Sequence, residues 1–222
     1  MKMKDYARSF SIALLSAILV INVSHNILIS YASGNTVPSG NVVVTEEYLI
    51  PDEAGISSRY VLLACNNTDS NITISAEFYA VDNDGAVIAT VTDYVDAVRK
   101  GQEFILYGQF KKEVVENATN FRYMLSFDCT DKCAYDAVDI KTETKADSTV
   151  VDVTGINYAH KDVEGINVRA IFYSEDKPVA FDYVNIADSG YLLHSGSTNY
   201  QQIGTVNIPF DDYIVTYTSC GF

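Results

Sequence analysis

The sequence predicts an all-β fold made of two similar β-sandwiches in tandem, and three observations lead to this prediction. The segment 72–79 has a counterpart in the segment 166–173, and both end in a Phe-Tyr pair. The later segment 123–127 has a counterpart in 213–217 with the same order of residue types. Apolar and polar residues alternate with the period of two that is typical of a strand with one buried face. No convincing helical period follows the N-terminal segment, so short strands and turns account for the chain.

Residues 1–32 have the features of a signal peptide. Three basic residues come first, residues 12–23 form an apolar core, and Ser30, Tyr31 and Ala32 fit a cleavage site. This core is shorter than the ~20 residues that cross a bilayer as a helix. The apolar residues 27–29, which follow a polar break, keep an uncleaved membrane anchor as the alternative. We expect a short linker at residues 33–41 to follow.

We expect the first sandwich to span residues 42–127. Alternation is clearest in residues 72–79, where four apolar side chains fall on one face and polar side chains on the other. Asp84 and Gly85 supply the next hairpin turn, because Gly tolerates a positive φ. Residues 93–98 could instead form a single helical turn. The expected strands are residues 42–45, 60–65, 72–79, 87–91, 104–107 and 121–127.

Residues 128–148 differ in composition from both units and are expected to connect them. They are rich in Asp, Lys, Thr and Glu, although residues 137–142 could form a strand. The second sandwich then spans residues 149–222, and each unit is long enough for an independent core of modest size. Its expected strands are residues 150–156, 166–173, 179–186, 191–194, 205–208 and 213–218.

Two turns and an aromatic pair carry a resemblance to a known family. In the first unit the residues concerned are Phe78, Tyr79, Asp82, Asp84, Gly85 and Gly101. In the second unit Phe172 and Tyr173 remain, Lys177 and Pro178 replace the Asp-Gly turn, and Gly196 lies near the place of Gly101. The pattern resembles the FxLYD-type domains and related immunoglobulin-like modules of exported bacterial proteins, over most of residues 56–127 and more weakly over 150–218. The resemblance implies two tandem immunoglobulin-like β-sandwiches in an extracytoplasmic protein of a bacterium, without known catalytic machinery.

The acidic composition limits the partners that we expect. The chain has a net charge of −14, and removal of residues 1–32 leaves 12 Lys and Arg against 28 Asp and Glu, a net charge of −16. A field of this sign repels nucleic acid and anionic lipid headgroups. We therefore expect no nucleic-acid partner, and membrane contact only through an uncleaved anchor. The charge can simply keep an exported protein soluble, or it can collect Ca²⁺ or basic partners.

The four cysteines suit an oxidising compartment, because their number is even and the chain begins with a signal segment. Cys129 and Cys133 are close in sequence, and we predict a disulfide between them that fixes the exit from the first sandwich. A pairing of Cys129 with Cys65 or with Cys220 is the alternative. Cys65 lies in an apolar run, where a buried, inert thiol is equally expected.

Candidate catalytic groups are few. His160 and His194 fall in different loops of the second unit, and no Ser lies in a nucleophile elbow. Three carboxylate pairs are available as acid and base of a glycosidase. Hydrogen bonding within a hairpin explains one of these pairs better, and the Ca²⁺-loop pattern fails there because Ala80 occupies its first position. We expect no enzymatic activity, no cofactor and no metal, with an extracellular hydrolase as the alternative. The pairs are Glu46 with Glu47, Asp82 with Asp84, and Asp211 with Asp212.

Aromatic residues offer a means of binding. The chain has 16 Tyr and 10 Phe but no Trp, and Tyr joins an apolar ring to a polar tip. The tyrosines either fill and rim the sandwiches or form a recognition face. The sequence therefore predicts a non-catalytic secreted or cell-surface module that binds protein or glycan, or that acts as a spacer. The tyrosines near strand ends or loops are Tyr79, Tyr94, Tyr107, Tyr158, Tyr173, Tyr183, Tyr191 and Tyr200.

Overall fold

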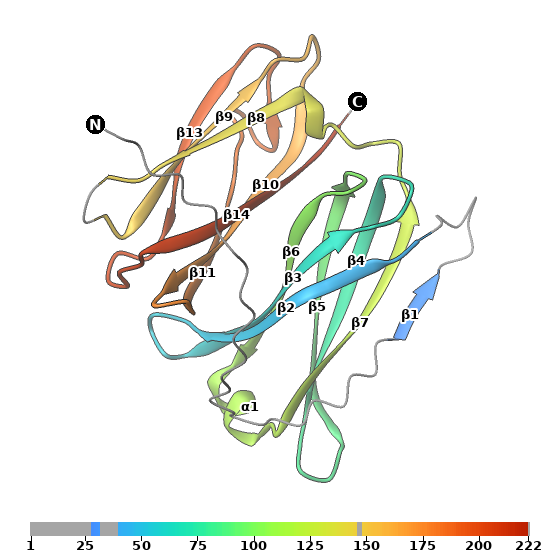
Figure 1. The fold of residues 1–222 in the computed structure, drawn as a ribbon, viewed down its shortest axis with the longest axis vertical. Coiled ribbons are helices and arrows are strands. Elements are labelled where there is room, and N and C mark those ends of the chain that lie inside the picture. Colours follow the sequence, from blue (N-terminus) through green and yellow to red (C-terminus); the bar gives the residue numbers. More distant parts are fainter. Residues whose placement is uncertain (1–27, 32–39, 146–147, 222) are drawn as a thin grey trace, which may run out of the picture.

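The fold is nearly all β and is built from antiparallel sheets packed face to face (Figure 1). The computed structural model describes residues 28–31, 40–145 and 148–221. The predicted all-β sandwich fold is confirmed. Of the predicted signal peptide, only residues 28–31 are described, so the proposed cleavage site at Ala32 lies outside the described residues.

The first sandwich contains two sheets with the strand orders β2-β3-β6 and β1-β7-β4-β5. A short helix, α1, joins β6 to β7, and β1 pairs with β7 in parallel at the outer edge (Figure 1). The bounds are β1 (Leu28–Tyr31), β2 (Val42–Pro51), β3 (Ser57–Asn66), β4 (Ile72–Val81), β5 (Val87–Val98), β6 (Glu103–Lys111), α1 (Lys112–Asn117) and β7 (Asn120–Cys129).

The second sandwich repeats this strand order. Its sheets are β8-β9-β13 and β14-β10-β11, and the short β12 also pairs with β10. A 3-10 turn, η1 (Tyr135–Ala137), precedes β8. The bounds are β8 (Val138–Glu143), β9 (Val150–Asn157), β10 (Val163–Ser174), β11 (Lys177–Asn185), β12 (Leu192–Leu193), β13 (Thr198–Gly204) and β14 (Asp212–Cys220).

The repeat in the sequence is also a repeat in strand register. Phe78 of β4 lies opposite Tyr123 of β7, and Phe172 of β10 lies opposite Tyr213 of β14. In both sandwiches these aromatic residues pack in the interior between the two sheets. The repeated residues are therefore those that fill each sandwich.

Several elements differ from the sequence prediction. The segment expected as a connector contains β8, at the place where a strand over residues 137–142 was the alternative, and β8 pairs with β9 and buries Val138 in the second sandwich. Residues 93–98 continue β5 as a strand instead of a helical turn. Residues 205–208 form no strand, and β13 lies just before them, because Gly204 ends it with a φ of 125°. The polar residues of β13 hid this strand, which lies at the edge of its sheet.

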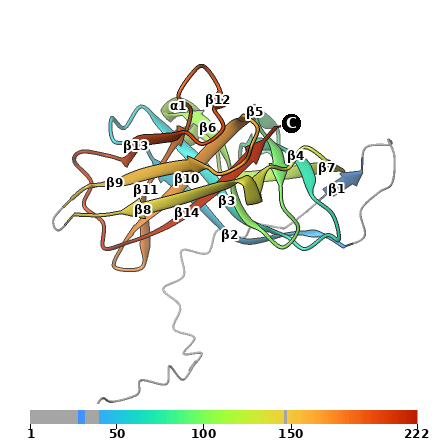
Figure 2. The same ribbon diagram turned by 90° about the horizontal axis from the view of Figure 1, so that it is seen from above.

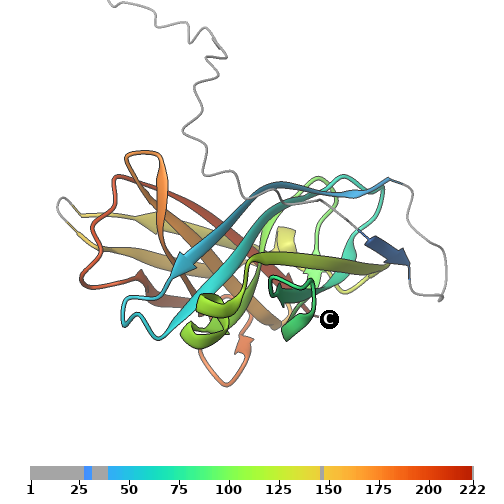
Figure 3. The ribbon, with the colours of Figure 1, turned by 90° about the horizontal axis from the view of Figure 1, so that it is seen from below.

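The two sandwiches are packed against each other. The half coloured blue to green lies beside the half coloured yellow to red in Figure 1, and the two halves overlap when seen from above and below (Figures 2 and 3). The sheet β2-β3-β6 faces the sheet β14-β10-β11 across an apolar cluster, so β3 is buried on both faces. Two sandwiches joined only by a linker would make a stalk, whereas this interface makes one packed body. The buried residues of the cluster are Ile50, Val61, Leu63, Ile105, Ile171, Tyr173 and Phe181.

One buried ion pair crosses the interface. The Arg169 guanidinium on β10 contacts the two carboxylate oxygens of Asp93 on β5 at 2.5 and 3.0 Å. It also donates to the Ile105 carbonyl at 2.7 Å, and the Tyr107 N–H donates to Asp93 at 3.1 Å. The Arg169 and Asp93 side chains are only 10% and 11% exposed. Bidentate geometry and these added hydrogen bonds satisfy both charges away from water.

Candidate functional site

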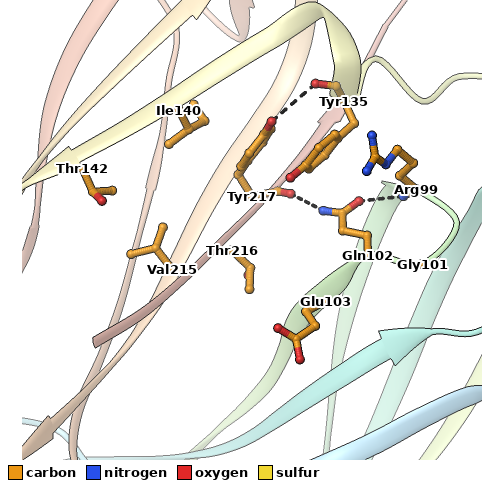
Figure 4. A pocket seen from close by; sticks show the side chains of 10 residues that line it. All are labelled: Arg99, Gly101, Gln102, Glu103, Tyr135, Ile140, Thr142, Val215, Thr216 and Tyr217. Atoms are coloured by element: carbon orange, nitrogen blue, oxygen red, sulfur yellow. Dashed lines mark hydrogen bonds between the residues drawn. The ribbon is translucent and has the colours of Figure 1, made fainter. Parts of the chain in front are cut away.

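A groove runs along one side of the second sandwich between β8 and β14. A pocket of about 400 Å³ lies at one end, against the turn that joins β5 to β6 (Figure 4). A second pocket of about 400 Å³ lies at the other end, between Thr144 after β8 and Tyr213 on β14. The Tyr213 hydroxyl donates to Thr142 Oγ1 at 3.4 Å and bridges the two strands. We call this feature the β8–β14 groove.

The backbone of β14 presents one edge to this groove. At its C-terminal end, Ala134 N–H donates to Ser219 O and Gly221 N–H donates to Lys132 O, both at 3.1 Å. These bonds show that residues 219 and 221 turn their backbone groups away from β10. Because the direction alternates along a strand, residues 213, 215 and 217 also face outward.

Most of this outward edge has no neighbouring strand among the described residues. The Tyr217 carbonyl accepts a hydrogen bond from Gln102 Nε2 at 2.5 Å (Figure 4), where a side chain of the first sandwich takes the place of a strand. The backbone N–H and C=O of Val215 have no hydrogen-bond partner in the described part of the chain. An unpaired strand edge of this kind is a template for a further strand.

Aromatic rings form the end wall of the groove. The rings of Tyr135 and Tyr217 stack with centroids 4.3 Å apart and an interplanar angle of 8° (Figure 4). The Tyr217 hydroxyl donates to the carbonyls of Val138 at 3.1 Å and Tyr135 at 3.4 Å. Burial raises the pKa of this hydroxyl, and the hydrogen bond with Tyr135 acts in the same direction. Tyr217 therefore stays a neutral donor that holds the wall in place.

Charged side chains of the first sandwich border the groove. The Arg99 guanidinium lies 4.7 Å from the centroid of the Tyr135 ring and contacts Asp136 at 2.5 Å. The backbone N–H of Arg99 donates to Gln102 Oε1 at 2.7 Å, and this hydrogen bond orients the side-chain amide of Gln102 toward β14. Glu103 lies beside it in the pocket lining (Figure 4). Both sandwiches thus contribute to the site.

This groove was not predicted from the sequence. Its lining comes from the segment expected as a connector, from a turn and from the last strand. The possible strand at residues 137–142 was one available signal, because Ile140 and Thr142 lie on one side of such a strand. The residues that line the groove at its aromatic end include Gln102, Tyr135, Ile140, Thr142, Val215 and Tyr217.

The two cysteines of the predicted disulfide, Cys129 and Cys133, lie opposite different residues. Cys129 ends β7 opposite Ile72, whereas Cys133 lies in the connector opposite Cys220. The predicted Cys129–Cys133 disulfide stays a prediction. The Cys65 thiol on β3 donates to Asn67 Oδ1 at 3.2 Å.

Among the described residues, no Ser, Thr or Cys side chain is hydrogen-bonded to the ring of either histidine. His194 Nδ1 lies 2.6 Å from Asp188 Oδ1, and this hydrogen bond raises the pKa of His194. The pair is in an open loop, with His194 48% exposed. His160 lies in the loop between β9 and β10. Neither lines the β8–β14 groove.

The carboxylate pairs have structural partners. Asp82 accepts hydrogen bonds from the N–H groups of Asp84 at 3.0 Å and Ala86 at 2.9 Å, which confirms the hairpin explanation. Glu46 accepts from the Tyr48 hydroxyl, and Glu47 accepts from the Tyr60 hydroxyl at 2.5 Å.

The third pair lies at the base of β14. Asp211 accepts from the N–H of Glu175 at 2.9 Å, and Asp212 accepts from its neighbour Tyr213 at 2.8 Å. Within the ranges that the structure describes, no cluster of three or more His, Cys, Asp or Glu side chains is placed to hold a metal ion.

The tyrosines divide between packing and exposure. Tyr107 and Tyr173 pack at the interface between the sandwiches. Five others are exposed, so packing alone does not account for them: Tyr94, Tyr158, Tyr183, Tyr191 and Tyr200.

Comparison with known proteins leaves the function open. No protein-family model matches the chain, and no curated protein matches it. Among solved structures, the crystal structure of red sea bream transglutaminase is similar over 78% of this chain and 29% of its own length, with 9% identity and a TM-score of 0.27. A likeness this distant carries no conclusion about activity. In the described part of the chain, no helix is long and apolar enough to cross a membrane.

Proposed function

We propose that the protein is a non-catalytic module of the cell exterior that binds an extended segment of another protein in the β8–β14 groove. The observation that carries this proposal is the outward edge of β14, where the backbone groups of Val215 have no partner among the described residues. When a peptide adds to a strand edge, main-chain hydrogen bonds supply affinity and side-chain pockets supply specificity. The two pockets of the groove lie along this edge.

The apolar lining of the groove supports the same proposal. Ile140, Val215 and Tyr217 pack against the interior of the second sandwich but remain partly exposed. An added strand would cover these side chains and remove apolar surface from water, at about 25 cal/mol per Å². The bound segment would therefore place apolar side chains at alternate positions, facing the groove.

Placement outside the cytoplasm rests on the N-terminal segment, and the charge of the chain favours certain partners. A net charge of −14 raises the association rate of neutral or basic segments over acidic ones. Binding to a basic segment should therefore weaken as the salt concentration rises.

The test uses a proline at the centre of the edge. In Val215→Pro, the edge of β14 loses one outward backbone N–H. The hydrogen bonds between β14 and β10 are kept, because the backbone N–H and C=O of Val215 point away from β10. Peptides selected from a displayed library of random sequences on the purified protein should bind this variant at least tenfold more weakly. Circular dichroism of the variant checks that it is folded.

Thr90→Pro is the matched control. Thr90 lies on the edge strand β5, opposite Tyr79 of β4. The backbone groups of Tyr79 point toward β7, so the N–H of Thr90 is not bonded to β4 and also faces outward. This variant should bind the selected peptides like the unaltered protein. Equal binding by all three proteins, or no selected peptide at all, would overturn the proposal, and the second result would favour a spacer. Binding to a glycan array that Val215→Pro leaves unchanged would favour glycan recognition instead.

A further inference from the structure

Cys133 and Cys220 lie opposite each other, close in sequence to Tyr135 and Tyr217 at the aromatic end of the β8–β14 groove. They form an isolated antiparallel bridge between the connector and the last residue of β14. The two flanking hydrogen bonds, from Ala134 N–H to Ser219 O and from Gly221 N–H to Lys132 O, define a non-hydrogen-bonded pair.

Such a pair has the geometry that a disulfide needs. Cα atoms of non-hydrogen-bonded pairs are about 4.5 Å apart, and disulfides span Cα separations of about 4.4–6.8 Å. In such a pair the side chains also leave the two backbones on the same side of the ladder. Cys133 is partly buried and Cys220 is 7% exposed, so the two thiols share a sheltered site.

We infer that Cys133 and Cys220 form a disulfide in an oxidising compartment. The bond joins the connector to the C-terminal end of β14, and so ties the beginning of the second sandwich to its last strand. Tyr135 and Tyr217, which wall the groove, lie two and three residues from the bonded cysteines. The disulfide therefore fixes the end wall of the groove.

The oxidant is a second disulfide, and the reaction proceeds by exchange. One Cys thiolate attacks the oxidant disulfide, forms a mixed disulfide and releases one thiolate of the oxidant. The second Cys thiolate attacks the mixed disulfide at the protein sulfur and releases the other half of the oxidant. Two protein thiols are oxidised by two electrons, two protons leave them, and the oxidant is reduced to two thiols. Burial raises the pKa of both thiols, so exchange is slow at neutral pH unless folding is incomplete or a catalyst is present.

The experiment is disulfide mapping of the purified full chain after refolding with oxidised and reduced glutathione. Trypsin cleaves after Lys132 and so places Cys129 and Cys133 in different peptides. Mass spectrometry without reduction should find the Cys133 peptide linked to the Cys220 peptide. A Cys129–Cys133 or Cys129–Cys220 link would overturn the inference, as would four unlinked cysteines in the folded, oxidised protein.

Matched variants separate the bond from other effects of the substitutions. Cys65→Ser should keep the Cys133–Cys220 link, whereas Cys220→Ser should leave Cys133 open to a thiol-specific reagent. The melting temperature should rise on oxidation in the unaltered chain and in Cys65→Ser, and should not change in Cys220→Ser. An equal rise in Cys220→Ser would overturn the inference. This test uses no peptide ligand and no export, so its outcome is independent of the proposed function.

Discussion

The two sandwiches have equivalent residues in their interiors but differ on the outer face of the strands β4 and β10. Along β4, the residues that alternate with the interior positions include Ser75 and Glu77, which are partly exposed. The equivalent positions of β10 carry Arg169 and Ile171, which are both buried. The repeated residues specify a sandwich, and the departures from the repeat specify where the second sandwich docks on the first.

The sandwiches also differ at one edge. In the first, β1 pairs with β7, and Leu125 and Phe127 are 1% and 2% exposed. In the second, the equivalent residues Val215 and Tyr217 are partly exposed beside the groove. Among the described residues, β7 is therefore covered by a neighbouring strand, whereas the equivalent strand β14 has an open edge beside the groove.

The largest expected effect comes from exchanging the residues that distinguish β4 from β10. Ile171→Glu gives the second copy the residue of the first and places an unpaired carboxylate in the buried cluster between the sandwiches. It should lower the free energy of unfolding by about 4–5 kcal/mol, since a buried charge without a partner is among the costliest changes. Denaturation by urea measures the effect.

Glu77→Ile is the reciprocal control. Glu77 is partly exposed, and its change should alter the free energy of unfolding by less than about 1 kcal/mol. Similar losses in the two variants would show that the two faces do not differ as described.

A smaller effect is expected from the buried ion pair. Arg169→Met leaves the Asp93 carboxylate beside the Tyr107 N–H without its cation. Breaking such a pair should cost about 3–4 kcal/mol in the free energy of unfolding. The double variant with Asp93→Asn should recover part of this loss, because no charge then remains buried.

Arg99→Met tests the same chemistry at the surface. Arg99 and Asp136 are 44% and 78% exposed, so the loss should be below about 1 kcal/mol and should shrink further in high salt. Equal losses at the two arginines would mean that burial does not determine the contribution of the Arg169 pair.

The sequence predicted the sandwich interiors because their signal is local. Alternation at Ile72, Ile74 and Phe78 fixes which face of β4 is buried, and its repetition in β10 fixes the second interior. The interface was not predicted, because it depends on which outer faces meet. Its trace in the sequence is the unbroken apolar run of residues 60–64 in β3, which alternation with one wet face does not explain.

The candidate site was harder to predict for a related reason. The edge of β14 is open because no strand of the described residues pairs with it, and the lack of a neighbour leaves no pattern in the residues of β14 itself. Val215 has the same apolar character as its buried counterpart Leu125. Only the strand order distinguishes the two positions.

The last and most local effect concerns the edge that β1 covers. β1 lies within residues 1–32, so cleavage after Ala32 would remove it and open the β7 edge. In a chain that begins at Ser33, the outward amides of Leu125 and Phe127 should exchange with solvent about tenfold faster than in the full chain, because they lose the neighbouring strand. The amide of Ser126, which faces β4, should change much less. Hydrogen exchange measured by NMR on both chains decides this, and Val215 provides an internal standard for an open edge. Unchanged exchange at Leu125 would mean that β1 does not protect β7, and the contrast between the two edges would then need another cause.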